Sequence, residues 1–384
     1  GANTWSLGGQ TLTGSGTLKV RISDDAGNHG SAFSQAYVLD TTAPTISFSD
    51  VTLSADTGAS NTDLITNTAA QTISATLSAA PAAGDIVQAS LDNGASWTDV
   101  TSKVSGTTLT WNGVTLAASD TLQFRVIDAA GNNGAVTSRA YVLDTTGPTS
   151  SVASVAFSAD SGASNSDFIT NTADQTISGT LSANLAAGET VLVSLDNGGS
   201  WVSATATVGS NSWSLAGQTL TGSNTLLVKV SDLAGNDGAV MSQAYVYDTE
   251  ATVPTVDALT SNSTAPVLTG SATLAAGETM TVTVGGATYN VTPVAGSWSL
   301  DLATAVPVSG TLNLILNNRY SVVATVTDLA GNTATDVSTN ELTVGVLTQT
   351  SAPPPLPVET QTPPPMIVQP ITETGLPGSP APIV

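Results

Sequence analysis

The chain has 384 residues, no Cys, one His, seven Lys and Arg residues, and 29 Asp and Glu residues, for a formal net charge of −22. Nucleic-acid binding needs a basic surface and an anionic membrane repels acidic chains, so this composition excludes both partners. No run of about 20 apolar residues is present, so we predict no membrane insertion in this segment.

One sequence pattern recurs along the chain. D-x-A-G-N begins at Asp24, Asp128, Asp232 and Asp328, and Y-V-x-D-T begins at Tyr37, Tyr141 and Tyr245. A longer string, S-A-D-[TS]-G-A-S-N, begins at Ser54 and Ser158. The period of about 100 residues is the size of a complete small domain and too long for a solenoid unit. The sequence therefore predicts a string of domains.

In chain order, we predict five segments. Residues 1–43 hold the C-terminal half of a repeat, and residues 44–148 and 149–254 are complete repeats. Residues 255–346 form a shorter, divergent repeat, and residues 347–384 are a Pro-rich linker or tail. Such a Pro-rich segment favours polyproline II or disorder. Because the first segment starts inside a repeat, we expect the chain to be a piece of a longer one.

The complete repeats show the alternation of a β-sandwich. Seven short runs are predicted to be strands: residues 45–53, 71–77, 86–91, 96–100, 107–116, 121–127 and 135–143. Seven strands in about 100 residues fit an immunoglobulin-like sandwich. In the clearest run, Leu122, Phe124 and Val126 are predicted to face inward. Trp5, Trp111, Trp213 and Trp298 occupy an equivalent strand and are predicted core aromatics. The predicted fold class is all-β, with tandem immunoglobulin-like β-sandwiches in a linear array.

Three strings resemble a known family: the D-x-A-G-N turn, the D-T-T-x-P-T linker, and S-A-D-T-G-A-S-N-T-D-x-I-T-N. They are similar to the bacterial Ig-like repeats of giant biofilm-associated, type I-secreted adhesins, over about residues 1–346. The resemblance implies rigid rods stiffened by Ca²⁺ near domain junctions. It also implies an extracellular or cell-surface location in a Gram-negative bacterium, with neighbouring Ig-like repeats of the same longer chain as partners. Residues 255–346 depart from the pattern because they lack the S-A-D-T-G segment.

Strand counting places the acidic residues at the two ends of each sandwich, because successive loops alternate between ends. The C-terminal end receives Asp56, Asp63, Asp160 and Asp167, together with the linker residues Asp40, Asp144 and Asp248. The N-terminal end receives Asp85, Glu189 and Glu278, together with Asp24, Asp128, Asp232 and Asp328. We therefore expect Asp56, Asp63, Asp144, Glu189 and Asp232 to converge at one junction, and Asp160, Asp167, Asp248, Glu278 and Asp328 at the next.

Converging carboxylates need a counter-ion. Two unit charges about 4 Å apart repel by roughly 4 kcal/mol at a surface-like dielectric. Oxygen ligands without His or Cys select a hard cation, so Ca²⁺ is the predicted metal. The alternative is that these Asp residues are ordinary turn formers that hydrogen-bond their own loops.

No catalytic site is predicted. Residues 90–97 and 194–201 match the S-x-D-x-G-x-[ST]-W Asp-box, in which Asp and Ser tie down a hairpin turn while the Trp packs beneath it. His29 is the only His and lies in the incomplete repeat, so a Ser-His-Asp site is not expected. We predict that the protein is not an enzyme.

These features predict a mechanical role. The chain is interpreted as a Ca²⁺-stiffened stalk, or extender, segment of a bacterial adhesin, supporting cell adhesion or biofilm formation. The alternative is a structural subunit of a surface layer or extracellular filament. In that case a strand from another copy completes the half-repeat at residues 1–43, whose edges are open.

Overall fold

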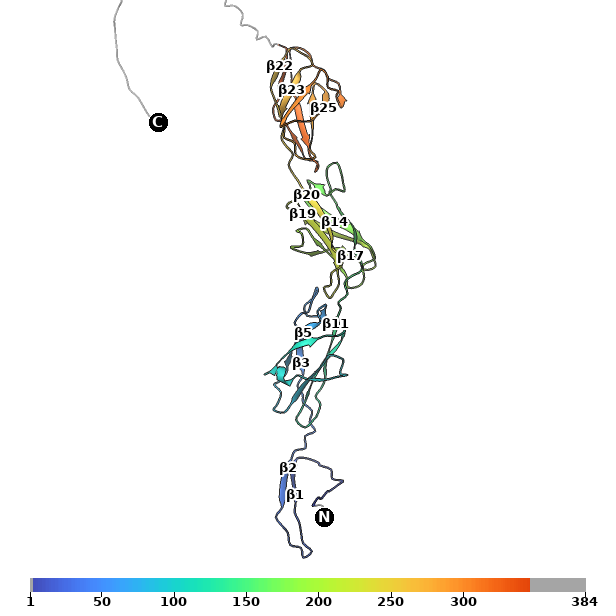
Figure 1. Ribbon diagram of the computed structural model, residues 1–384, viewed down its shortest axis with the longest axis vertical. Helices are drawn as coiled ribbons and strands as arrows, with labels where there is room; N and C mark the ends of the chain where they lie inside the picture. The colour runs from blue at the N-terminus through green and yellow to red at the C-terminus, as the bar shows by residue number, and fades with distance from the viewer. Residues whose placement is uncertain (1–2, 346–384) are drawn as a thin grey trace, which may run out of the picture.

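The computed structural model describes residues 3–345, which form a two-stranded sheet followed by three β-sandwiches in a row (Figure 1). Each sandwich encloses its own hydrophobic cluster. The only helical turn in the described part is η1 (Thr101–Lys103), so the predicted all-β fold class is confirmed. The Pro-rich segment predicted at residues 347–384 lies outside the described residues. Between residues 3 and 345 no helix has the length and apolar character that a membrane crossing requires.

The first sandwich spans residues 48–143 and packs two sheets face to face, one antiparallel and one mixed. One sheet has the order β3 (Phe48–Leu53), β5 (Ala70–Leu77), β9 (Thr108–Thr115), β8 (Val104–Ser105). The other has the order β4 (Ile65–Thr66), β11 (Thr137–Leu143), β10 (Asp120–Ile127), β6 (Ile86–Ser90), β7 (Thr98–Asp99). All seven predicted runs form strands. On β10, Leu122, Phe124 and Val126 are fully buried, and Phe124 stacks on Phe48 with ring centroids 5.2 Å apart.

The second sandwich spans residues 152–247 and repeats this topology. Its first sheet has the order β12 (Val152–Phe157), β14 (Asp174–Leu181), β18 (Ser212–Thr219), β17 (Thr205–Ala206). Its second sheet has the order β13 (Ile169–Thr170), β20 (Met241–Tyr247), β19 (Asn224–Ser231), β15 (Thr190–Ser194), β16 (Val202–Ser203). The internal repeat in the sequence is therefore a repeat of the strand order.

The third sandwich spans residues 255–344 and is built from three smaller sheets. The first has the order β21 (Thr255–Val256), β23 (Val267–Ser271), β26 (Ser297–Asp301). The second has the order β22 (Leu259–Ser261), β31 (Leu342–Val344), β28 (Asn318–Tyr320). The third has the order β27 (Ser309–Gly310), β25 (Ala287–Val291), β24 (Thr279–Val284), β29 (Val323–Thr327), β30 (Thr333–Thr335). Its core is as complete as the other two, with Trp298 2% exposed.

The segment before the first sandwich is an open hairpin of β1 (Gly16–Val20) and β2 (Phe33–Tyr37). Trp5 is 64% exposed and Phe33 is 63% exposed. The predicted core role is wrong for Trp5, because no second sheet faces it within residues 3–43. It is confirmed for Trp213 and Trp298, which are 3% and 2% exposed, and Trp111 is half-buried.

The Asp-box is confirmed as a structural hairpin. Asp92 Oδ1 accepts hydrogen bonds from Ser90 Oγ at 2.7 Å and from the Ser96 backbone N–H at 2.8 Å. Ser96 Oγ donates to Asp92 Oδ2 at 2.5 Å. These bonds, chiefly the one from the Ser96 hydroxyl, lower the pKa of Asp92 to about 2. Asp196 has the equivalent bonds and the same lowered pKa, about 2.

Ser96→Ala is expected to raise the pKa of Asp92 towards its ordinary value of about 3.9. A lowered carboxyl pKa contributes stability above the unfolded-state pKa, and this contribution is lost as the pH falls through about 2. The variant should therefore move the onset of acid unfolding to higher pH. NMR titration of the side-chain carboxyl carbons measures both sites at once. Asp196 is the internal control, and an unchanged Asp92 would contradict the assigned cause.

Candidate functional site at the junctions between sandwiches

A loop that we call the tongue leaves the C-terminal end of each of the first two sandwiches. It covers residues 54–67 in the first and residues 158–171 in the second, and each range begins with the S-A-D-[TS]-G-A-S-N string. A buried glutamine holds its base: Gln71 Nε2 donates to the carbonyl oxygens of Ala55 at 3.0 Å and Thr68 at 2.6 Å. Gln175 makes the equivalent bonds in the second sandwich. The tongue is therefore an anchored element of the fold.

A short strand that the sequence did not predict lies near the C-terminal end of each tongue. β4 pairs in parallel with β11, and β13 pairs in parallel with β20. The residues just before these strands, Leu64 and Phe168, have φ values of 63° and 62°, which are uncommon for bulky side chains. Asp56 Oδ2 accepts the Leu64 N–H at 3.0 Å, and Asp160 Oδ2 accepts the Phe168 N–H at 2.9 Å. One oxygen of each tongue carboxylate thus fixes an unusual backbone turn.

Each tongue contacts the D-x-A-G-N turn of the following sandwich. Thr57 Oγ1 donates to the Ala234 carbonyl oxygen at 2.5 Å, and Ser161 Oγ donates to the Ala330 carbonyl oxygen at 2.6 Å. Ala234 and Ala330 are each 1% exposed. The alanines of the two turns that receive no tongue, Ala26 and Ala130, are exposed. The predicted end-to-end meeting of these two loops is therefore present at both junctions.

The asparagine of the D-x-A-G-N turn in each of the three sandwiches binds the linker that enters the sandwich. Asn236 Nδ2 donates to the Asp144 carbonyl oxygen at 2.9 Å and to Asp232 Oδ2 at 2.9 Å. The same linker bonds run from Asn132 to Asp40 at 3.1 Å and from Asn332 to Asp248 at 2.8 Å. The sequence carries one signal for these residues, since Asn occupies the last position of all four turns.

The predicted acidic residues all make hydrogen bonds within their own loops. The turn residues Asp24, Asp128, Asp232 and Asp328 each accept the backbone N–H of the asparagine four residues on. The linker residues Asp40, Asp144 and Asp248 accept the N–H two residues on. Asp85, Glu189 and Glu278 accept the N–H three residues back. Asp63 and Asp167 accept the N–H two residues on. Turn formation is therefore one role of this set.

The asparagine bonds also affect acidity. The Asn28 side chain is the main reason why the pKa of Asp24 lies below its ordinary value. The Asn132 side chain lowers the pKa of Asp128 in the same way. Both turns therefore hold their Asp as a carboxylate, and its negative charge stays at the N-terminal end of the domain.

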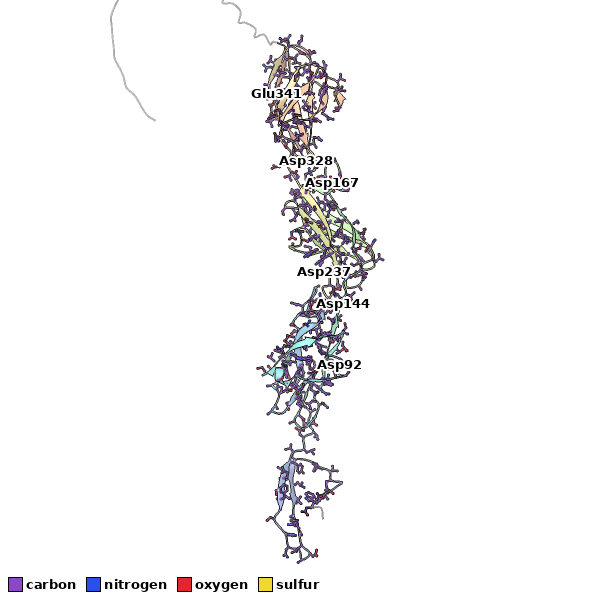
Figure 2. The ribbon with its side chains drawn as sticks, in the orientation of Figure 1. Asp92, Asp144, Asp167, Asp237, Asp328 and Glu341 are labelled. Atoms are coloured by element: carbon purple, nitrogen blue, oxygen red, sulfur yellow. The ribbon has the colours of Figure 1, made fainter. Side chains whose placement is uncertain are left out.

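The two junctions gather different side chains (Figure 2). The second junction has a cleft of about 480 Å³, and among its lining residues are Asp248, Glu250, Glu278 and Asp328. Three of these belong to the predicted set, whereas Asp160 and Asp167 do not line this cleft. The first junction also has a cleft of about 480 Å³, where Asp232 lies near the Lys229–Asp237 ion pair of 2.6 Å and Lys229 lies over the Trp201 ring.

The described residues contain no group of three or more His, Cys, Asp or Glu side chains placed to hold a metal ion. One observation nevertheless fits a cation. Asp56 Oδ1 and Asp160 Oδ1 are buried and have no hydrogen-bond partner in the described part of the chain. Burial, with the neighbouring Asp63 charge as a smaller cause, raises the pKa of Asp56. A carboxylate oxygen of this kind suits a hard cation, which would complete its shell with carbonyl oxygens and water.

Comparison with known proteins identifies the repeats. Residues 147–249 match one family model described as a bacterial Ig-like domain, and residues 61–145 match a second model with the same description. The chain carries two bacterial Ig-like domains. Domains of this kind typically serve as structural or adhesion modules. No curated protein matches the chain.

Several solved structures match the chain at low sequence identity. A titin I-band fragment, I67–I69, is 11% identical, with 79% of this chain and 99% of that chain covered and a TM-score of 0.32. The chicken CNTN1 FN1–FN3 domains are 15% identical, with 76% and 98% covered and a TM-score of 0.26. The BSP domain of a biofilm-associated protein is 12% identical, with 80% and 67% covered and a TM-score of 0.18.

Proposed function

We propose that these residues form a stalk, or extender, segment of an adhesin secreted by, or attached to, a Gram-negative bacterium. The observation that carries the proposal is the linear array, in which each full sandwich docks directly on the next (Figure 1). The linkers between sandwiches are short, since β11 ends at Leu143 and β12 begins at Val152. Such an array has the geometry needed to hold a terminal binding domain away from the cell.

We further propose that Ca²⁺ stiffens the junctions. The support is that Asp56 Oδ1 and Asp160 Oδ1, each in a tongue that contacts the next sandwich, are buried without a hydrogen-bond partner among residues 3–345. The charge balance of the chain supports it as well, because seven basic side chains face 29 acidic ones. A cation at Asp56 would oppose the effect of burial and return its pKa to a lower value.

A second candidate function rests on the open hairpin of residues 3–43. Ile22 and Val38 are each 83% exposed, and Trp5 and Phe33 are more than half exposed. An apolar strand pair of this kind can be covered by a strand from another copy, which would make the chain a subunit of a filament or surface layer.

Small-angle scattering of the chain in millimolar Ca²⁺ and after chelation tests both functions. A calcium-stiffened stalk is expected to be an extended monomer in Ca²⁺ and to become more flexible, with a smaller maximum dimension, after chelation. Superimposable curves in the two conditions would remove the calcium proposal. The forward scattering gives the mass, and a mass that grows with concentration would favour the filament subunit over the stalk.

A further inference from the structure

At one glycine of each tongue, the backbones of successive sandwiches lie close together. Gly58 and Gly162 have φ values of 94° and 89°, which glycine adopts without strain. A Cβ on Gly58 would collide with the Leu233 carbonyl oxygen, and a Cβ on Gly162 would collide with the Leu329 carbonyl oxygen. Two independent constraints, the backbone angle and the contact, therefore require glycine at this place in each tongue.

The D-x-A-G-N turn has the same internal structure whether or not a tongue contacts it. In all four turns the Asp N–H donates to the Asn carbonyl oxygen, and the Gly N–H donates to the Asp carbonyl oxygen. The difference is burial, because Ala234 and Ala330 are 1% exposed while Ala26 and Ala130 are exposed. The turn is thus a preformed surface that a tongue covers.

We infer that the D-x-A-G-N turn is the surface by which a repeat recognises the tongue of the repeat before it, through protein contacts that need no metal. The hydrogen bonds from Thr57 to Ala234 and from Ser161 to Ala330 join protein groups directly. The partner that fits the turn is a repeat carrying S-A-D-[TS]-G. The turns at residues 24–28 and 128–132 present the same surface without a tongue in the described residues.

This recognition has a direction. The tongue leaves the C-terminal end of one sandwich, and the turn lies at the N-terminal end of the next. The third sandwich accepts a tongue at Ala330 but has no S-A-D-[TS]-G segment of its own. Gly345 also occupies the position after its last strand where the other sandwiches have Asp144 and Asp248. Within residues 255–345, the third sandwich therefore carries no tongue of this kind for a following repeat.

The absence of Cys allows a direct test in the full chain. Ser105→Cys and Thr205→Cys place spin labels on exposed positions of β8 and β17, on either side of the first junction. The label-to-label distance distribution is measured after chelation for this background, for Gly58→Ala and for Gly131→Ala. Gly131 is the matched control because it has the same φ of 94° and open space around it. Gly58→Ala is expected to lose the single narrow distribution, while Gly131→Ala keeps it.

A second pair tests the turn side of the contact. Ala234→Leu enlarges a buried side chain in the contacted turn, and Ala130→Leu makes the same change in the exposed equivalent. Only Ala234→Leu is expected to broaden the distribution. The inference is overturned if Gly58→Ala and Ala234→Leu stay as narrow as their controls, or if chelation alone broadens the background as much as they do. The background with and without Ca²⁺ separates the inference from the calcium proposal. Broadening by chelation that is smaller than the broadening by Gly58→Ala supports both, broadening that is as large supports the calcium proposal alone, and no broadening supports the inference alone.

Discussion

Trp298→Ala is expected to lower the free energy of unfolding of the third sandwich by about 3–5 kcal/mol, the usual cost of removing a large aromatic side chain from a packed core. Trp298 is 2% exposed on β26, and its Nε1 donates to the Thr255 carbonyl oxygen at 2.9 Å. The substitution therefore leaves both a cavity and a carbonyl group without its donor.

The effect should stay within one sandwich. Each sandwich encloses a separate hydrophobic cluster, so calorimetry of the full chain should resolve transitions that belong to individual sandwiches. Only the unfolding transition of residues 255–345 is expected to shift to a lower temperature. Trp111→Ala is the control, since Trp111 occupies the equivalent strand of the first sandwich but is only half-buried and should cost less. A joint shift of all transitions would show that the array unfolds as one unit.

The strands could be predicted from the sequence because apolar and polar side chains alternate along a strand that is buried on one face. Leu122, Phe124 and Val126 face inward as expected, and counting strands placed the tongue and the D-x-A-G-N turn at facing ends. Short β4 and β13 were missed because two residues are too few for a period of two to be recognised. Trp5 was misplaced because the alternation of one sheet says nothing about whether a second sheet covers it.

The junction was predicted only in part, for a related reason. Counting strands gives the end of the sandwich at which a loop lies but not its position across that end. Asp248, Glu278 and Asp328 share one cleft, while Asp160 lies in the tongue and binds the Phe168 N–H. Gly58 and Asn236 were missed because both meet backbone carbonyl groups of another repeat, which no side-chain pattern encodes. Their recurrence within the chain was the one available signal.

Asp56→Asn is expected to remove the stabilisation that Ca²⁺ gives to the first sandwich. A ligand that binds only the folded state adds about 2.7 kcal/mol at roughly 100 times its dissociation constant. The wild-type chain should therefore melt at a higher temperature in Ca²⁺ than after chelation, and the variant should show no such difference. The Asn oxygen can still accept the Leu64 N–H, which now bonds Asp56 Oδ2 at 3.0 Å.

In chelator the same variant is expected to be at least as stable as the wild type. The raised pKa of Asp56 means that its burial destabilises the folded protein as the pH rises above the unfolded-state pKa of about 3.9. An amide removes that buried charge and its repulsion from Asp63. Asp50→Asn is the matched control, because Asp50 is exposed in the same sandwich and its φ of 50° suits Asn. Asp50→Asn should leave the rise in melting temperature that Ca²⁺ causes unchanged. If Ca²⁺ raises the melting temperature of Asp56→Asn as much as that of the wild type, the ion binds elsewhere. If Ca²⁺ does not raise the melting temperature of the wild type, the folded junction has no calcium site of useful affinity.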